Sequence, residues 1–392
     1  MTSEWHEVPL RELVGYISKG IAPSYAEEAS ETTIRVLNQK CNRNFRISYG
    51  DSRLHDTLKK KVPPERYVKP DDILINSTGA GTAGRIAQIE DVPSATTIDG
   101  HMILIRSNRK VTQKFLGYAL KAHQWEVLQL DEGSTGQTEL NRDRLLDEIM
   151  INYPVSFDEQ NAIVGTLESI DRKLIVNEQL NDNLQQQAAA LFSSLYDRSN
   201  TEVRFTDLIQ ILGGGTPKTG ENTYWNGNIA FFTPKDVGIP YTLITEKTIS
   251  KEGLSHCNSR LYPVNTVFVT ARGTVGKVGM SGVPMAMNQS CYALVGKETH
   301  QLLVYFYTLK AVDRLKHKAS GAVFDAITTR DFESEQIMKL SDDDATAFLR
   351  VAEPMFQEVL NNNIENLRLS TLRDSLLPKL MSGEIDVSAV QL

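Results

Sequence analysis

Two stretches of the chain carry apolar residues at alternating spacings of four and three, the period of a coiled-coil helix. The first begins near Ser156 and the second near Ser341, and glycine is almost absent from both. Ser156 with Glu159, and Ser341 with Asp344, resemble the capping boxes of helix N-termini. We therefore predict one long helix in each stretch, and Pro354 should kink or restart the second near its beginning.

The two heptad patterns match position by position. The first comprises Ile163, Leu167, Ile170, Leu174, Asn177, Asn181, Leu184, Ala188, Leu191 and Leu195, and the second comprises Phe348, Ala352, Met355, Val359, Asn362, Asn366, Leu369, Arg373, Leu376 and Leu380. Antiparallel packing would set Asn177 against Asn366 and Asn181 against Asn362. We predict an asparagine layer that fixes the register at some cost in stability, unless these side chains face water. Arg373 is expected where the seam opens.

The remaining sequence has a different pattern, with many Gly, Pro and Thr residues and short β-type runs such as 73–75, 102–105 and 266–269. Helical stretches at 114–130 and 301–318 follow these runs. The fold class predicted is α+β, with two similar α/β domains separated by two long antiparallel coiled-coil helices. The expected boundaries are 1–152 for the first domain, 153–199 for the central helix, 200–339 for the second domain and 340–392 for the last helix.

The two α/β domains are copies of each other, which predicts an internal pseudo-twofold repeat. Leu13, Val14, Ile17 and Gly20 match Leu208, Ile209, Leu212 and Gly215; Gly133 matches Gly321; Arg142-Asp143 match Arg330-Asp331; and Ile149-Met150 match Ile337-Met338. Gly81-Thr82-Ala83-Gly84-Arg85-Ile86 also match Gly273-Thr274-Val275-Gly276-Lys277-Val278. A duplicated domain suggests a molecule that does one job at two places.

Composition is that of an ordinary globular protein, with 392 residues, 41% hydrophobic and 23% charged. No apolar stretch approaches the roughly 18 residues of a membrane span, and the N-terminus has no signal-peptide pattern. The three cysteines, Cys41, Cys257 and Cys291, are widely spaced, which favours reduced thiols and a cytoplasmic location.

The net charge of −7 argues mildly against a nucleic-acid partner, but its distribution is uneven. One segment is strongly basic and contains Lys40, Arg43, Arg46, Arg53, Lys59, Lys60, Lys61, Arg66 and Lys69. Asn and aromatic residues are interleaved with these cations. The segment is either a solvated face or an arm that neutralises phosphates and touches bases.

A glycine-rich turn follows the apolar run at 73–75, and its letters, GAGTAG, fit a dinucleotide-binding turn. The second copy argues against that function, because it keeps only Gly-Thr-x-Gly followed by a cation. Such a turn would present a hydroxyl and a positive charge to a phosphate. No metal-binding spacing, nucleophile motif, methyltransferase motif or Walker box is present, so the chain is predicted to carry no catalytic chemistry.

The chain resembles the specificity subunit of type I restriction–modification enzymes over essentially its whole length. The resemblance lies in GGGTPKTGENTYWNGNI, SRLYPVNTVFVTARGTVGKV, MNQSCYAL, FDEQNAIVGTLESIDRKL, NLQQQAAALF and NNNIENLRLSTLRDSLLPKLMSGEI. The last of these is the most specific signature. The first domain keeps ILINSTGAGTAGRI, but its segment 40–69 matches no motif of the family.

The resemblance implies two target recognition domains, each reading half of a bipartite, asymmetric site on double-stranded DNA. The antiparallel helices would hold the domains apart. Two methyltransferase subunits would dock on this chain, and restriction (motor) subunits would join the complex. S-adenosylmethionine, ATP and Mg²⁺ would then belong to those partners, with no cofactor or metal bound by this chain and no membrane association.

The residues that we expect to contact DNA are cations, amides and hydroxyls, which bind phosphates or base edges. They are Lys40, Arg43, Arg46, Arg53, Thr82 and Arg85 in the first domain, and Thr216, Lys218, Lys235, Arg272, Thr274, Lys277, Asn288 and Gln289 in the second. Alternatively, Asn288 and Gln289 cap a strand and the lysines are only solvated. Two competing functions stay open, a scaffold that joins proteins without reading DNA and a dinucleotide enzyme.

Overall fold

The computed structural model describes residues 4–132, 139–318 and 326–387, and its internal contacts divide the chain into two compact units. Unit 1 comprises residues 1–173 and 370–392, and unit 2 comprises residues 174–369. The matched pair Gly133 and Gly321 lies outside the described residues. Within the described ranges, no helix is both long and apolar enough to cross a membrane.

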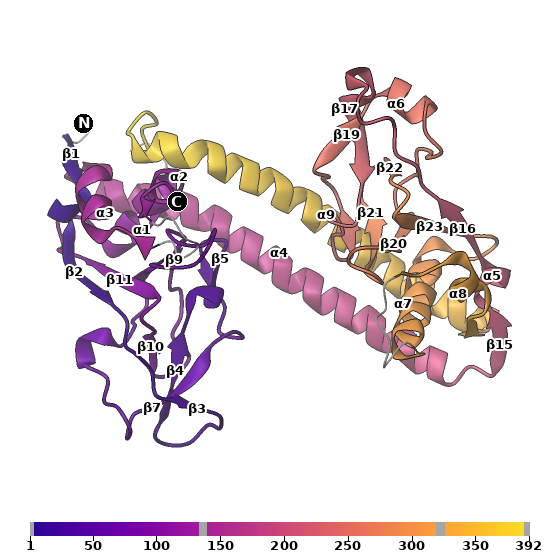
Figure 1. Cartoon of the computed structure of the whole chain (residues 1–392), viewed down its shortest axis with the longest axis horizontal. Helices are drawn as coiled ribbons and strands as arrows, with labels where there is room; N and C mark the ends of the chain where they lie inside the picture. The colour runs from indigo at the N-terminus through magenta and orange to yellow at the C-terminus, as the bar shows by residue number, and fades with distance from the viewer. Residues whose placement is uncertain (1–3, 133–138, 319–325, 388–392) are drawn as a thin grey trace. The chain divides into compact units, whose positions relative to one another are not determined.

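Unit 1 contains two four-stranded sheets (Figure 1). Its strands are β1 (Trp5–Pro9), β2 (Val14–Lys19), β3 (Tyr25–Ala26), β4 (Thr33–Leu37), β5 (Asn42–Arg43), β6 (Arg46–Ile47), β7 (Arg53–Asp56), β8 (Ile73–Asn76), β9 (Ile86–Gln88), β10 (Thr96–Ile98), β11 (Met102–Ser107), β12 (Asp131–Glu132), β13 (Glu139–Leu140) and β14 (Met150–Pro154). Its shorter helices are α1 (Gln113–Ala122), α2 (Gln124–Val127) and α3 (Arg142–Glu148). One sheet has the antiparallel order β2-β11-β8-β9, and the other has the order β10-β4-β7-β3 with β10 and β4 parallel.

Unit 2 repeats this topology. Its strands are β15 (Thr201–Arg204), β16 (Ile209–Gly213), β17 (Trp225–Phe232), β18 (Tyr241–Thr242), β19 (Lys247–Ile249), β20 (Val267–Thr270), β21 (Val278–Ser281), β22 (Met285–Met287), β23 (Cys291–Gly296) and β24 (Gln336–Lys339), and its shorter helices are α5 (Phe205–Leu208), α6 (Lys251–Ser255), α7 (Gln301–Lys318) and α8 (Thr329–Glu333). The order β16-β23-β20-β21 corresponds to β2-β11-β8-β9 in unit 1. The parallel pair β17–β22 corresponds to β4–β10. The predicted duplication of an α/β domain is therefore confirmed.

The hydrogen-bond registers correct several residue matches made from sequence. Gly15 is an extra residue at a β-bulge, because Tyr16 and Val14 pair with consecutive residues of β11. Beyond the bulge, Gly20 corresponds to Gly214 instead of Gly215, and Ile17 corresponds to Ile211 instead of Leu212.

The matches near the end of each α/β domain are also displaced. Asn141 and Thr328 both cap a helix, so the match of Arg142-Asp143 with Arg330-Asp331 is off by one residue. Val8 pairs with Ile151 and Val203 pairs with Ile337, so Ile149-Met150 correspond to Glu335-Gln336. The second match is displaced by one residue more than the first, because α8 is shorter than α3.

The two predicted long helices are α4 (Phe157–Asp197, 41 residues) and α9 (Asp342–Met381, 40 residues). Ser156 Oγ accepts a hydrogen bond from Glu159 N, and Ser341 Oγ accepts one from Asp344 N, as helix N-caps do. The predicted restart of the helix at Pro354 is wrong, because α9 is continuous through that residue. The neighbouring Ala352 and Phe356 are buried in the core of unit 2, which holds this part of the helix in place.

Inside unit 2, α4 and α9 run antiparallel (Figure 1). Their asparagine side chains hydrogen-bond across the two helices. Asn177 Nδ2 donates to Asn366 Oδ1 at 2.8 Å, and Asn362 Nδ2 donates to Asn181 Oδ1 at 2.9 Å. These are the two pairs that the heptads predict. Asn177, Asn181 and Asn362 are at most 5% exposed, so their amides do not face water.

Inside unit 1, the same helices meet through charges. Arg373 Nη1 lies 3.0 Å from Asp171 Oδ1, and Asp171 also accepts from Tyr118 and Lys121 of α1. The expectation that Arg373 marks an opening of the seam is therefore wrong, because its side chain is only 18% exposed. The charged layer ties α1, α4 and α9 together.

The end of α9 completes the core of unit 1. Leu377 and Leu380 belong to the same buried cluster as Ile163 and Leu167 of α4. Gly383 has a φ of 77°, and beyond it Ile385 N donates to Lys379 O, which terminates the helix as a C-cap turn does. The family-like signature at the end of the chain thus encodes a helix and its cap.

The asparagine pairs can be tested by removing one or both partners. Asn181→Leu leaves the buried Asn362 amide without its acceptor, so we expect a loss of about 1–3 kcal/mol in unfolding free energy. The double variant Asn181→Leu/Asn362→Leu should regain most of that loss, because no buried amide is left unpaired. Urea denaturation of the three proteins measures this, and an unaffected single variant would contradict the pairing.

The charged layer should make stability depend on pH. Burial by itself raises the pKa of Asp171, but Lys121, Tyr118 and Arg373 outweigh burial and lower it below the usual value. The stability that the ionised carboxylate contributes is therefore present above the unfolded pKa of about 3.9 and is lost as pH falls through the folded pKa.

We expect Asp171→Asn to lower the unfolding free energy at pH 7. The difference in unfolding free energy between this variant and the wild type should become smaller below about pH 4. Denaturation at pH 7 and pH 3 measures the change. Asp182→Asn, at an exposed position of α4, is the matched control and should show no such narrowing. A difference for Asp171→Asn that stays constant with pH would rule out the ionic layer as its cause.

Candidate nucleic-acid interface

Three strand ends of unit 2 surround a hollow of about 460 Å³. Its lining residues are Thr233, Pro234, Lys235, Glu246, Lys247, Arg272, Gly273, Thr274, Asn288 and Ser290. Lys235 follows β17, Arg272 and Thr274 lie in the β20–β21 turn, and Asn288 follows β22. The structure therefore brings together four residues that the sequence predicts to bind DNA.

A close backbone approach holds these strand ends together. A Cβ on Gly214 would overlap the carbonyl oxygens of Met287 and Asn288, so only glycine fits there. Next to it, Thr216 Oγ1 donates to Gln289 Oε1. Thr274 Oγ1 donates to Pro234 O at 3.2 Å and links the β20–β21 turn to the end of β17.

Part of the Asn288 side chain is used in a hydrogen bond within unit 2. Its Oδ1 accepts from Ser290 N at 3.0 Å, as Asp99 Oδ1 accepts from His101 N in unit 1. The strand-capping alternative thus accounts for the Asn288 oxygen. Of the residues predicted to contact DNA in this domain, all but Asn288 are exposed: Thr216, Lys218, Lys235, Arg272, Thr274, Lys277 and Gln289. Lys235 has a weak ion pair at 3.8 Å with Glu246.

In unit 1, the predicted arginines of the basic segment lie on a small hairpin. Arg43 of β5 lies directly opposite Arg46 of β6. The two turn residues, Asn44 and Phe45, both have positive φ, as a two-residue type I′ hairpin requires. Arg43 Nη2 also forms a weak ion pair with Asp51 at 3.9 Å, so part of the charge of this hairpin is balanced within unit 1.

The hairpin is anchored to the β8–β9 turn. Asn42 Nδ2 donates to Asn76 Oδ1 at 3.2 Å and to Arg85 O at 2.8 Å. Lys40, Arg43, Arg46 and Arg85 therefore come from one neighbourhood. Arg53 lies in a different contact, with its guanidinium carbon 3.3 Å from the centre of the Tyr25 ring.

The glycine-rich turns have the shape that was predicted but not all of the predicted chemistry. Gly81, Gly84, Gly273 and Gly276 all have positive φ, between 67° and 83°. The prediction that both turns present a hydroxyl is wrong for Thr82, because its Oγ1 is buried with no partner among the described residues. Arg85 folds back to donate to Gly81 O at 3.2 Å.

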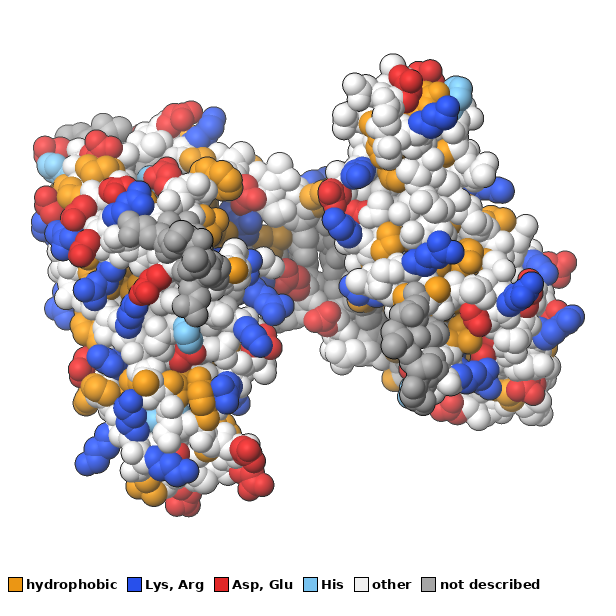
Figure 2. All heavy atoms as spheres, in the orientation of Figure 1, with side chains coloured by type: hydrophobic (Ala, Val, Ile, Leu, Met, Phe, Trp, Pro, Cys, Tyr) orange, Lys and Arg blue, Asp and Glu red, His pale blue; other side chains and the backbone are white. Residues whose placement is uncertain are grey.

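Other cations of the basic segment are used within unit 1. Lys60 Nζ donates to Ala22 O, and Arg66 donates to Gly20 O. Lys59 forms an ion pair with Asp56. Lys and Arg side chains are also interspersed with Asp and Glu on the visible surface, so that face shows no continuous basic patch (Figure 2). The candidate contacts are therefore local clusters.

Sequence reasoning missed a polar group at the strand ends of unit 1. Thr78 Oγ1 lies 2.7 Å from His101 Nδ1 and 3.4 Å from Gln39 Oε1. His101 is exposed and the other two are half-buried. An alignment on the shared glycines matches Ala80 with Arg272. The backbone hydrogen bonds instead match Thr78 with Arg272. The sequence therefore carried no signal that marked Thr78.

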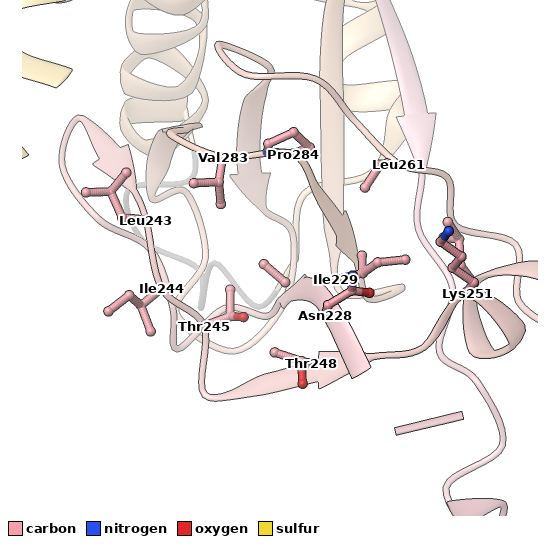
Figure 3. Close-up of a pocket in the computed structure, with 12 residues that line it drawn as sticks. Asn228, Ile229, Leu243, Ile244, Thr245, Thr248, Lys251, Leu261, Val283 and Pro284 are labelled. Carbon is pink, nitrogen blue, oxygen red and sulfur yellow. The ribbon is translucent and has the colours of Figure 1, made fainter. Parts of the chain in front are cut away.

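A larger hollow of about 770 Å³ lies elsewhere in unit 2 and is mainly apolar (Figure 3). Ile229 lies on β17, Leu243 and Ile244 lie between β18 and β19, and Val283 and Pro284 lie between β21 and β22. Lys251 is the one charged residue among its lining residues. None of the predicted DNA contacts lines it, so size does not identify the interface.

The described residues contain no group of three His, Cys, Asp or Glu side chains able to hold a metal ion. Burial raises the pKa of the Cys41 thiol, and it raises the pKa of Cys291 to about 12, so neither is poised as a nucleophile. What the two units offer is cations, amides and hydroxyls on strand-end loops, which is the chemistry of binding.

Comparisons with known proteins agree with this description. Residues 2–186 and 198–339 match the family model described as the type I restriction modification DNA specificity domain. The HindI specificity subunit of Haemophilus influenzae is 28% identical over 186 residues, which cover 46% of this chain and 40% of the relative. The MjaIX specificity subunit of Methanocaldococcus jannaschii is 29% identical over 127 residues, covering 31% of this chain and 29% of the relative.

These matches span well under two thirds of the length of the curated relatives. A solved structure of a type I restriction–modification S subunit from M. genitalium covers 97% of this chain and 96% of its own, with a TM-score of 0.62 and 15% identity. At that identity the likeness shows that the fold is shared.

The close approach at Gly214 can be tested by adding a methyl group. Gly214→Ala would force the backbone apart at the strand ends. We therefore expect the unfolding free energy to fall by about 1–3 kcal/mol, which is the usual cost of overpacking. Gly213→Ala is the matched control, because nothing lies within 4 Å of a Cβ there. Thermal unfolding measures both variants, and equal melting temperatures would contradict the packing described.

Proposed function

Because the chain belongs to the family of type I restriction–modification DNA specificity domains, we propose that it is the DNA-reading subunit of such a complex. It reads a bipartite, asymmetric site on double-stranded DNA and directs adenine methylation or restriction by partner subunits. The observation that carries this proposal is the family match over both α/β domains, each of which has polar side chains at equivalent strand ends.

In this proposal, residues 1–152 and 200–339 are the two target recognition domains, and 153–199 and 340–392 are the helices that join them. Lys40, Arg43, Arg46, Arg53 and Arg85 supply cations to one half-site. Thr216, Lys218, Lys235, Arg272, Thr274, Lys277, Asn288 and Gln289 face the other. Cations neutralise phosphates and set the position, whereas amides and Arg can read base edges.

Catalysis is proposed to lie outside this chain. Two methyltransferase subunits bind S-adenosylmethionine, and the restriction subunits bind ATP and Mg²⁺. The asparagines at 177, 181, 362 and 366 are proposed to set the register of the helices that the partners meet. This function fits the side chains described, which provide binding groups at the strand ends.

The two competing functions make different predictions. A dinucleotide-binding turn joins a strand to a helix, but the GAGTAG turn joins the antiparallel strands β8 and β9, which removes the enzyme hypothesis. A protein scaffold would show no sequence-dependent effect on DNA, even with its partners bound.

The proposed function is tested by coexpressing the chain with its methyltransferase subunit in a host free of DNA methylation, and mapping N6-methyladenine across the genome. We expect a two-part motif with an unread gap, absent when this chain is omitted. A stable complex that methylates without any motif would favour the scaffold instead.

A further inference from the structure

The duplication allows each strand-end position of unit 1 to be matched with its counterpart in unit 2 through identical backbone hydrogen bonds. Gly84 N donates to Asn76 O at 2.8 Å, and Gly276 N donates to Thr270 O at 2.8 Å. Cys41 N donates to Asn38 O, and Asp236 N donates to Thr233 O. These bonds set Arg85 against Lys277 and Lys40 against Lys235.

The same method matches the missed polar group. Ser77 N donates to His101 O, and Ala271 N donates to Ser290 O, each at 2.8 Å. Thr78 forms an isolated bridge with Glu139, and Arg272 forms one with Ala326. Thr78 therefore occupies the position of Arg272, and Gly100-His101 occupy the position of Gln289-Ser290.

The matched positions fall into two classes. At 40/235 and at 85/277 both units carry a cation, and the side chains at 40, 235 and 277 are exposed. Two other pairs make equivalent backbone hydrogen bonds but carry different side chains. Thr78 in unit 1 corresponds to Arg272 in unit 2, and His101 corresponds to Ser290. The neighbouring pair Gln39 and Pro234 also differs.

A protein that recognises two different half-sites needs both classes of position. The phosphates are the same in any DNA sequence, so the residues that bind them can be alike in both units, whereas the residues that read different bases must differ. Resting on the proposed function, we infer that Lys40, Lys235, Arg85 and Lys277 bind phosphates, whereas Thr78 with His101 and Arg272 with Gln289 read bases. Thr78 and His101 are new positions in unit 1, joined to each other and to Gln39 through the Thr78 hydroxyl.

The chemistry of each group suits this assignment. Thr78, His101 and Gln39 are hydrogen-bonding side chains that can match the donors and acceptors of a base edge. In the described part of unit 1, His101 Nε2 has no hydrogen-bond partner, while its Nδ1 is held by Thr78. Arg272 can contact guanine through two bonds at once, which a lysine cannot reproduce.

The test uses the complete complex with the methyltransferase subunit and maps methylation in vivo. Thr78→Val removes the hydroxyl while keeping the shape, and Thr78→Ser is the matched control that keeps it. We expect Thr78→Val to lower discrimination by roughly 5- to 100-fold at one position of one half-site. Arg272→Lys should lower base discrimination in the other half-site only. In each variant, the half-site read by the unchanged domain serves as the internal control.

The phosphate class is tested in the same assay. Lys40→Gln and Lys235→Gln should leave the motif unchanged, lower methylation at all sites alike, and reduce the salt dependence of DNA binding by the complex by about one charge each. An unchanged motif with Thr78→Val, or an altered one with Lys40→Gln, would overturn the division. Failure of the proposed function looks different, because the wild-type complex itself would then give no motif.

Discussion

The rest of the structure depends on the burial of the last turns of α9 in unit 1. Leu377, Leu380, Met381 and Val387 join a core whose other buried members lie between Leu10 and Leu167, so that core is closed by residues about 200 positions later in the chain. Unit 2 is built in the same way, since Phe192 of α4 and Phe348 of α9 both belong to its largest buried cluster among the described residues. Neither α/β domain therefore has a complete core of its own, and the long helices act as parts of both cores as well as connections. Contacts this distant in sequence carry a high entropic cost of closure, which the apolar seam must offset.

The polar layers explain why this seam closes in one way. A purely apolar heptad would tolerate shifts by one repeat, whereas a shift of α9 along α4 would leave the amides of Asn177 and Asn181 buried without partners. The layer formed by Asp171 and Arg373 adds an asymmetry, because the positions related to them by the repeat are Phe356 and Ala188, which are apolar. Burying a pair of charges contributes little net stability, but breaking it leaves an uncompensated charge, so the layer discriminates against wrong registers. The two ends of an otherwise repeated helix pair are thereby made different.

The sequence predicted most of the architecture, because the helix period and the duplication are both visible in the order of apolar and polar residues. It predicted the α+β class, both long helices and the asparagine pairs. It could not reveal the β-bulge at Gly15 or the shorter α8, since each shifts a match by one residue without changing the apolar pattern. It also assigned Arg373 from its charge alone, because a buried ion pair becomes visible only when Asp171 is placed beside it. Four of the residues that the sequence proposes as DNA contacts line the unit 2 hollow, whereas Thr78 was not proposed, because the first glycine-rich turn is two residues longer than the second.

The strand-end loops of the two units share the same backbone hydrogen bonds but carry different side chains. Gly20 and Gly214 each approach the end of a neighbouring strand so closely that a Cβ would overlap its carbonyls, and the loops bond through their own backbone N–H groups. Because the backbone polar groups are satisfied within the fold, a side chain there can change from threonine to arginine without leaving a buried group unpaired. Stability and recognition are then carried by different atoms of the same residues. That separation is the physical condition that the proposed function requires, in which one fold, present twice in one chain, reads two different half-sites.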